Sequence, residues 1–306
     1  MKKDETYINV VEEPKKMANI SAALVKELRE RTSLGMMECK NALVESNGDI
    51  DQAIELLRKA SGMKAAKKAG RTAAEGVVLV KIASDNSAGV MVEVNSETDF
   101  AAKEENFGNF SKQVLESAFD TKESDVSKLM DSELEPARLG LVQKIGENIS
   151  VRRVAVAAEE GLTVGSYVHS NNKIAVLVSL RGGDEALAKD VAMHVAAISP
   201  MVVNAEEVSA EVLSKESEIY TAQAAESGKP ADIVEKMVSG RLRKFIEEVS
   251  LTEQSFVKDP DIKVGKLAKD GNAEIKSFIR FEVGEGIEVA EVDFATEVAE
   301  QLKDAE

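Results

Sequence analysis

Short runs of alternating apolar and polar residues follow a first segment in which apolar residues recur at helical spacing. In "NISAALVKELRERTS", Leu24 and Leu28 lie one helical turn apart behind Ser21, whose hydroxyl can cap a helix. A second short helix is predicted for "ECKNALVES". A third is predicted after "NGD", where Asp49 and Gln52 can form a capping box. Three short helices so close together in sequence indicate a minimal helical bundle.

The middle of the chain contains an internal repeat. "GVVLVKIASDNSAGVMVEV" predicts a β-hairpin, and "FGNFSKQVLESAF" predicts a helix with Phe110, Val114 and Leu115 on one face. The same order returns in "GSYVHSNNKIAVLVSL" and "DEALAKDVAMHVAAIS". A further strand pattern follows each unit, "NISVRRVAVAA" and "IKSFIRFEVGEGIE". We therefore predict an α+β fold with a duplicated core of two three-stranded antiparallel sheets, each covered by helices.

A long helical segment interrupts the second unit. Apolar residues recur at helical spacing at Val234, Val238 and Phe245, and "SGKP" predicts a turn before them, so the segment is predicted to form an antiparallel helical hairpin. "FATEVAEQLK" predicts a last, C-terminal helix. The expected division of the chain is an extension or leader (1–17), a helical bundle (18–57), a basic helical linker (58–71), a first core subdomain (72–159), a second core subdomain (160–208 and 251–288), the inserted hairpin (209–250) and a C-terminal helical module (289–306).

The charge of the chain bears on its partners. Its 306 residues include 39 Lys and Arg against 55 Asp and Glu, a formal charge of −16, which argues against a nucleic-acid partner and favours a protein partner. The one basic stretch, "RKASGMKAAKKAGR", has no interleaved aromatic residues for base stacking, so a solvated helical linker is favoured over an RNA contact.

The cysteine content and the apolar runs of the sequence indicate the compartment in which the protein works. The single cysteine, Cys39, excludes an internal disulfide framework and fits a reducing compartment. No apolar run is long enough to span a bilayer and no signal peptide is recognisable, so we expect a cytoplasmic protein with no membrane partner.

The sequence offers little for covalent catalysis. His169 falls at a hairpin turn, and His194 lies in the apolar helix pattern "VAMHVAA", where a buried structural histidine is expected; neither has metal-ligand spacing to Cys39. "VGK" at residues 264–266 lacks the flanking residues of a phosphate-binding loop. We expect a binding module with no cofactor, no metal and no nucleotide of its own.

The sequence leaves open whether three apolar side chains are exposed or buried. Phe100, in "EVNSETDFAAKEENFG", follows a predicted strand end and either folds back under the sheet or points outward into a partner. Met36 and Met37 follow Gly35 between two helices and either fill the bundle core or form an adaptable contact surface.

Several ordered motifs resemble one family. They are "LVKELRERTSLGMMECKNAL", "NGDIDQAIE", "KAAKKAGR", "EVNSETDF", "KIGENISVRRVA", "GSYVH", "EKMVSGRLRKF", "EVSLTEQSFV" and "FIRFEVGEGIE". They resemble the bacterial elongation factor Ts family, the nucleotide exchange factors of elongation factor Tu, and the resemblance runs from about residue 18 to residue 297. Residues 1–16 lie outside that pattern.

The resemblance implies a ubiquitin-associated-like N-terminal bundle and a function without covalent chemistry. It implies that Thr98, Asp99 and Phe100 enter the GTPase domain of elongation factor Tu beside Mg²⁺ and the nucleotide. Further partner contacts are implied at Ile145, Gly146, His169, Arg29, Met36 and Met37. A homodimer or a 2:2 complex with elongation factor Tu stays open. The alternatives are a homodimeric structural protein and an RNA-associated helper.

Overall fold

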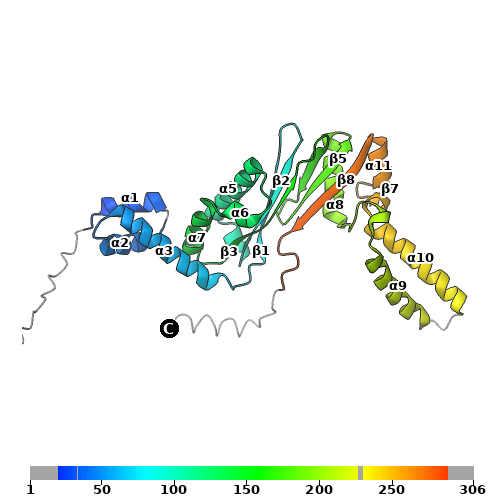
Figure 1. Cartoon of the computed structure of the whole chain (residues 1–306), viewed down its shortest axis with the longest axis horizontal. Coiled ribbons are helices and arrows are strands. Elements are labelled where there is room, and N and C mark those ends of the chain that lie inside the picture. The colour runs from blue at the N-terminus through cyan, green and yellow to red at the C-terminus, as the bar shows by residue number, and fades with distance from the viewer. Residues whose placement is uncertain (1–19, 33, 227–229, 289–306) are drawn as a thin grey trace, which may run out of the picture. The chain divides into compact units, whose positions relative to one another are not determined.

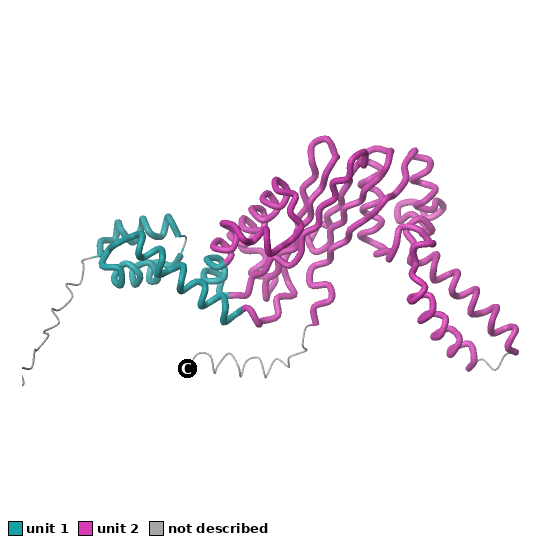
Figure 2. The backbone as a smooth tube through the Cα atoms, in the orientation of Figure 1, with its two compact units in different colours: residues 1–68, 139–146 teal, residues 69–138, 147–306 magenta. Residues whose placement is uncertain are grey.

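The computed structural model describes residues 20–32, 34–226 and 230–288 (Figure 1). The chain divides into two compact units, one formed by residues 1–68 and 139–146 and the other by residues 69–138 and 147–306 (Figure 2). The expected N-terminal extension, the C-terminal module and most of the "SGKP" turn lie outside the described residues.

The first unit contains a three-helix bundle. Helices α1 (Ala22–Thr32), α2 (Met36–Glu45) and α3 (Ile50–Lys68) enclose a core centred on Leu28, Cys39 and Leu43. Helix α3 is a single helix that crosses the expected boundary at residue 57, because its Ala- and Lys-rich second half is itself strongly helix-forming. The last residues of α7 (Leu134–Ile145) belong to the same unit, where the Gln143 amide donates to Glu38 at 2.9 Å.

Two predicted helix caps are present in this unit. The Leu24 N–H donates to Ser21 Oγ at 3.2 Å, and the Gln52 N–H donates to Asp49 Oδ1 at 2.9 Å. The prediction that the Gln52 side chain returns a hydrogen bond to complete a capping box is wrong. The Asp49 N–H instead donates to the carbonyl of Ser46 at 3.1 Å, because the chain makes a tight turn between α2 and α3.

The second unit begins with an antiparallel sheet of order β1-β2-β3. Its strands are β1 (Glu75–Ile82), β2 (Gly89–Ser96) and β3 (Ile149–Ala157), with β2 in the centre. Between β2 and β3 the chain forms α4 (Asp99–Ala102), α5 (Glu105–Thr121), α6 (Val126–Met130) and α7. Helix α5 packs on β1 and β2 and buries Phe110, Val114 and Leu115, the face predicted from the sequence.

The second sheet repeats this plan with the order β4-β5-β8. Strands β4 (Thr163–Val168), β5 (Ile174–Gly182) and β8 (Ala273–Glu282) are antiparallel, and α8 (Glu185–Ile198) covers β4 and β5. The fit of α8 requires Gly165, because a Cβ there would lie 2.4 Å from the Cβ of Ala188. The prediction of two three-stranded antiparallel sheets is confirmed.

Strand β5 carries two cores on its two faces. Val176, Val178 and Leu180 pack with α8, whereas Ala175 and Leu177 pack with residues of the first sheet. This alternation follows from the two-residue period of a strand. The two sheets therefore share one apolar layer inside the second unit, and each carries its own helix.

The predicted helical hairpin is present, and it is inserted between α8 and the end of the second sheet. Helices α9 (Ala210–Ala225) and α10 (Ala231–Val249) pack on each other. The base of the hairpin is fixed by backbone bonds from the Met201 N–H to Val249 at 2.8 Å and from the Leu251 N–H to Val202 at 3.0 Å.

Several short elements near this base have no counterpart in the sequence prediction. They are the 3₁₀ turns η1 (Ala205–Glu207) and η2 (Leu251–Glu253), the strand pair β6 (Ser255–Phe256) and β7 (Asp259–Lys263), and helix α11 (Val264–Asp270).

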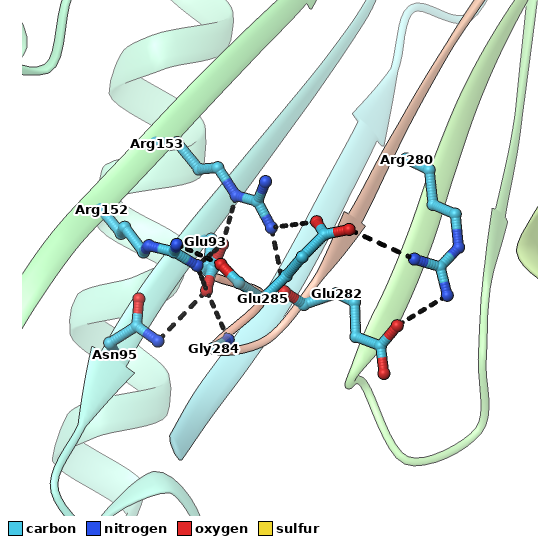
Figure 3. A network of polar contacts seen from close by, with 8 residues as sticks. All are labelled: Glu93, Asn95, Arg152, Arg153, Arg280, Glu282, Gly284 and Glu285. Carbon is cyan, nitrogen blue, oxygen red and sulfur yellow. Dashed lines mark hydrogen bonds and ion pairs between the residues drawn. The ribbon is translucent and has the colours of Figure 1, made fainter. Parts of the chain in front are cut away.

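A buried carboxylate joins the end of β8 to the first sheet (Figure 3). The side chain of Glu93, on β2, has no solvent exposure and accepts hydrogen bonds from the Gly284 N–H at 2.9 Å, from Asn95 Nδ2 at 3.1 Å and from Arg152 Nη1 at 3.1 Å. Arg153 Nε also donates to it. The network therefore connects three strands across both sheets.

A β-bulge makes this network possible. In the pairing of β2 with β3, Glu93 faces Arg153 and Val94 faces Val151, so Arg152 is an extra residue on β3. Consecutive strand residues normally point to opposite faces, and the bulge turns both arginines toward one carboxylate. Arg153 continues to the carbonyl of Glu282, the last residue of β8, at 2.9 Å and to the carboxylate of Glu285, just after β8, at 3.2 Å.

Candidate functional site

The segment after β2 presents an aromatic side chain to solvent. Thr98 is the N-cap of α4, and its Oγ1 accepts the Ala101 N–H at 3.2 Å. Ala101 is buried at 5 % exposure against the sheet, whereas the side chain of Phe100 is 79 % exposed. Adjacent residues of a helix point about 100° apart. Since Ala101 occupies the inward position, Phe100 points outward, and the local-packing alternative is wrong.

Lys103 contacts the side chains of both Asp99 and Phe100. Its Nζ donates to Asp99 Oδ2 at 2.6 Å and lies 5.8 Å from the centre of the Phe100 ring. The hydrogen bond from Lys103 holds the pKa of Asp99 below its usual value. Both side chains of this ion pair are largely exposed, so the pair is weak and Asp99 can exchange Lys103 for another cation.

The backbone of the element is held by a second loop. Glu147 accepts from the Thr98 N–H at 2.9 Å and from Thr98 Oγ1 at 2.7 Å. The sequence motif "KIGENISVRRVA" contains this glutamate, but only the preceding Ile145 and Gly146 were expected to have a role. The one sequence signal for a role of Glu147 was its position two residues before a strand.

Ile145 and Gly146 end helix α7 in the first unit. Ile145 is half-buried, and Gly146 is exposed with a φ of +86°, a left-handed conformation that favours glycine. The Gly146 N–H donates to the Val142 carbonyl at 2.9 Å and closes the helix.

His169 lies directly after β4, in an exposed turn. Its N–H donates to the Ile174 carbonyl at 2.9 Å, and its Nδ1 lies 3.4 Å from the hydroxyl of Tyr167. His169 and Tyr167 line a largely apolar cavity of about 370 Å³ together with Ile174, Met193, Ala196, Ala197, Val257 and Lys258.

The other histidine is structural, as the sequence indicated. His194 has no exposure; its Nε2 lies 2.9 Å from Gln254 Oε1, and its Nδ1 accepts the Val257 N–H at 3.1 Å. Burial lowers its pKa, so the ring stays neutral at neutral pH.

The turn that carries His169 lies near the segment that follows β2. The charge of Lys173, four residues further on, contributes to lowering the pKa of Asp99, after the larger effect of the Lys103 hydrogen bond. Lys173 also pairs with Glu75, which faces Ser96 in the register of β1 and β2. The turn between β4 and β5 that holds Lys173 therefore lies beside the end of the first sheet from which residues 98–100 continue.

The remaining expected contact residues lie in the first unit. Arg29 is exposed on α1. Met36 and Met37 are 58 % and 61 % exposed, so the possibility that they fill the core is wrong. They stand in the first turn of α2, and the expectation that they lie between two helices is also wrong, because Gly35 is already the N-cap.

Within residues 20–32, 34–226 and 230–288, no three His, Cys, Asp or Glu side chains gather so that they could hold a metal ion. Among the same residues, no helix has both the length and the apolar character needed to cross a lipid bilayer.

The exposed side chains of Phe100, Met36 and Met37, the first of them on a capped and braced helix, are of the kind that interaction surfaces present. Comparison with known proteins gives the family. The family model described as Elongation factor TS matches residues 97–285. The chain is 63 % identical over 287 residues to elongation factor Ts of Hahella chejuensis, covering 94 % of this chain and 100 % of that relative.

Further relatives agree over nearly the same length. Elongation factor Ts of Saccharophagus degradans is 62 % identical over 92 % of this chain and 98 % of its own, and that of Pseudomonas aeruginosa is 56 % identical over 94 % and 98 %. The chain therefore belongs to the elongation factor Ts family of translation factors. This result does not favour the alternatives of a structural homodimer or an RNA-associated helper.

Proposed function

We propose that this chain is a guanine nucleotide exchange factor that binds elongation factor Tu and promotes the release of GDP, so that GTP can reload. The exposed Phe100 on a braced element, in a chain of this family, is the observation that carries the proposal. Residues 98–100 enter the GTPase domain near Mg²⁺ and the nucleotide, and this chain binds no nucleotide of its own.

The step requires displacement and no covalent chemistry. A bound nucleotide owes much of its affinity to Mg²⁺ and to backbone N–H groups around its phosphates. Phe100 acts as a wedge that shifts these groups. Asp99 leaves its weak pair with Lys103 and competes for the ligands and waters of the ion.

The energy available from one side chain limits what the wedge can do alone. Burying one Phe side chain yields about 1.5–3 kcal/mol, and each tenfold in rate requires about 1.4 kcal/mol. Phe100 alone therefore accounts for roughly one to two decades of acceleration. Further acceleration comes from binding at the other contact positions, Ile145, Gly146, His169, Arg29, Met36 and Met37.

Thermodynamic linkage sets the order of affinities. If this chain weakens the binding of GDP to elongation factor Tu by some factor, GDP weakens the binding of this chain by the same factor. The complex is then tight without nucleotide and labile with it, which allows one molecule of the factor to act repeatedly.

The experiment is a pair of equilibrium titrations. Nucleotide-free elongation factor Tu and its complex with Mg²⁺ and GDP are each titrated with this protein by calorimetry. We expect much tighter binding to the nucleotide-free form, by the same factor as the loss of GDP affinity measured in the reverse titration. Equal affinity for the two forms would overturn the proposal.

A further inference from the structure

Two loops of the second unit exchange hydrogen bonds in a reciprocal pattern. Glu147 accepts the Thr98 N–H at 2.9 Å, and Glu97 accepts the Asn148 N–H at 2.5 Å. Each loop therefore supplies one carboxylate to a backbone N–H of the other. We call residues 97, 98, 147 and 148 the reciprocal clamp.

The clamp is anchored to Arg71 through Asn148 and Glu97. Asn148 is 8 % exposed, and its Nδ2 donates to the Arg71 carbonyl at 2.9 Å. The guanidinium of Arg71 lies 3.6 Å from Glu97. The clamp is thus attached to the segment that leads into β1, and its other end holds the start of α4.

Thr98 connects the clamp to the wedge. A hydroxyl has one proton to donate and lone pairs to accept. Thr98 Oγ1 donates to Glu147 at 2.7 Å and accepts the Ala101 N–H at 3.2 Å. Because Glu147 takes the proton, a lone pair of the hydroxyl is left directed at Ala101.

Helix α4 depends on this cap more than a longer helix would. It has only four residues, too few for a helix to be stable on its own. Ala101 is its one residue buried against the sheet. When the cap is lost, the direction of Phe100 is no longer fixed, although nothing in the core has changed.

We infer that Glu147 is a positioning residue of the exchange reaction: it holds the Thr98 cap, and through it the direction in which Phe100 enters the partner. The inference rests on the proposed function. Glu147 follows Ile145 and Gly146 in the chain, so its backbone neighbours are also expected contact residues. Its own carboxylate acts through Thr98 and does not touch the partner.

The first test measures the free protein. In Glu147→Gln, one amide oxygen replaces two carboxylate oxygens, so it can serve only one of the two Thr98 donors well. We expect the Ala101 N–H to exchange with deuterium at least about tenfold faster than in the wild type, while the thermal midpoint stays the same. Unchanged exchange at Ala101 would overturn the inference.

The second test separates rate from binding. Release of a fluorescent GDP analogue from elongation factor Tu is followed at increasing concentrations of this protein. We expect Glu147→Gln to lower the maximal release rate about tenfold and to leave the half-saturating concentration within about threefold. Glu105→Gln, an exposed glutamate nearby with the same change of charge, is the matched control and should behave as the wild type.

Variants of Thr98, the residue that Glu147 holds, complete the design. Thr98→Val keeps the shape of the side chain, loses the hydroxyl and should match Glu147→Gln, whereas Thr98→Ser keeps the hydroxyl and should be faster than Thr98→Val. The double variant Thr98→Val with Glu147→Gln should be no slower than the slower single variant, since both remove the same contact.

The outcomes distinguish this inference from the function on which it rests. If the wild-type protein does not accelerate release, the proposed function fails and the inference fails with it. If the wild type accelerates release and Phe100→Ala slows it, but Glu147→Gln remains as fast as the wild type, only the positioning role of Glu147 is refuted.

Discussion

Replacing Glu93 by Gln should destabilise the second unit far more than an ordinary surface change. The Glu93 side chain has no exposure and accepts from Arg152, Arg153 and the Gly284 N–H. Removing one partner of a fully buried ion pair costs about 3–5 kcal/mol. Both arginines keep 27–28 % exposure and can reach water, so we expect the low end, about 3 kcal/mol.

Urea unfolding at pH 7 measures this cost. The matched control is Glu282→Gln, which makes the same change of charge in the same network but on a side chain that is 47 % exposed and paired with Arg280. It should cost less than about 1 kcal/mol. Equal costs for the two variants would refute the view that Glu93 holds the two sheets together.

The stability lost in Glu93→Gln should also depend on pH. Burial alone would raise the pKa of Glu93, but the hydrogen bonds from Gly284, Arg153 and Arg152 outweigh it and lower the pKa below the usual 4.5. The unfolded chain then takes up a proton on this residue before the folded one does. Its contribution to stability is present above pH 4.5 and is lost as the pH falls through the lower, folded pKa. The free-energy difference between the wild type and Glu93→Gln should therefore shrink below pH 4.5.

Three further predictions concern other parts of the chain. Replacing Met36 and Met37 by Asp should weaken binding to elongation factor Tu in a titration while circular dichroism of the free protein stays unchanged, because both side chains are exposed; loss of the helical signal would contradict this. Deleting residues 210–247 with a short linker should leave a soluble protein with a cooperative melt, because the bonds at the hairpin base involve residues outside the deletion. Gly165→Val should lower the thermal midpoint by several degrees, since its Cβ would collide with Ala188; an unchanged midpoint would show that α8 can move aside.

The periodic parts of the fold were predictable. The two hairpins and the helices after them have long, regular patterns, and the repeat of the same order supported each assignment. The caps at Ser21 and Asp49 could also be located, because an N-cap acts within three residues of itself. Local signals of this kind are contained in a short stretch of sequence.

Elements without a strong local signal were missed. Helix α4 has four residues and β6 has two, so neither shows a period. The second half of α3 was expected to be a separate, solvated helical linker, because its basic, Ala-rich stretch has no interleaved aromatic residues. The helix itself was expected, and its high content of Ala and Lys lets α3 continue without a break to Lys68.

The site was predictable in part. The family resemblance indicated residues 98–100, but the sequence alone could not decide whether Phe100 points inward, because Ala101 takes the inward position only once the sheet is formed. Glu147 lies 49 residues from Thr98 in the chain, and their contact depends on the pairing of β2 with β3. A contact between residues so far apart in the chain leaves no pattern in a single sequence.

The most direct test of the central claim is the release of a fluorescent GDP analogue from elongation factor Tu, measured by stopped flow with the wild-type protein and with Phe100→Ala. The wild type should accelerate release, and Phe100→Ala should lower the accelerated rate by roughly one to two decades, the amount that burial of one Phe supplies. The control Ile219→Ala, which truncates an exposed apolar side chain of the helical hairpin, should match the wild type. Because Phe100 is 79 % exposed, its variant should melt as the wild type does. Release at the wild-type rate by a Phe100→Ala protein with an unchanged melt would contradict the account.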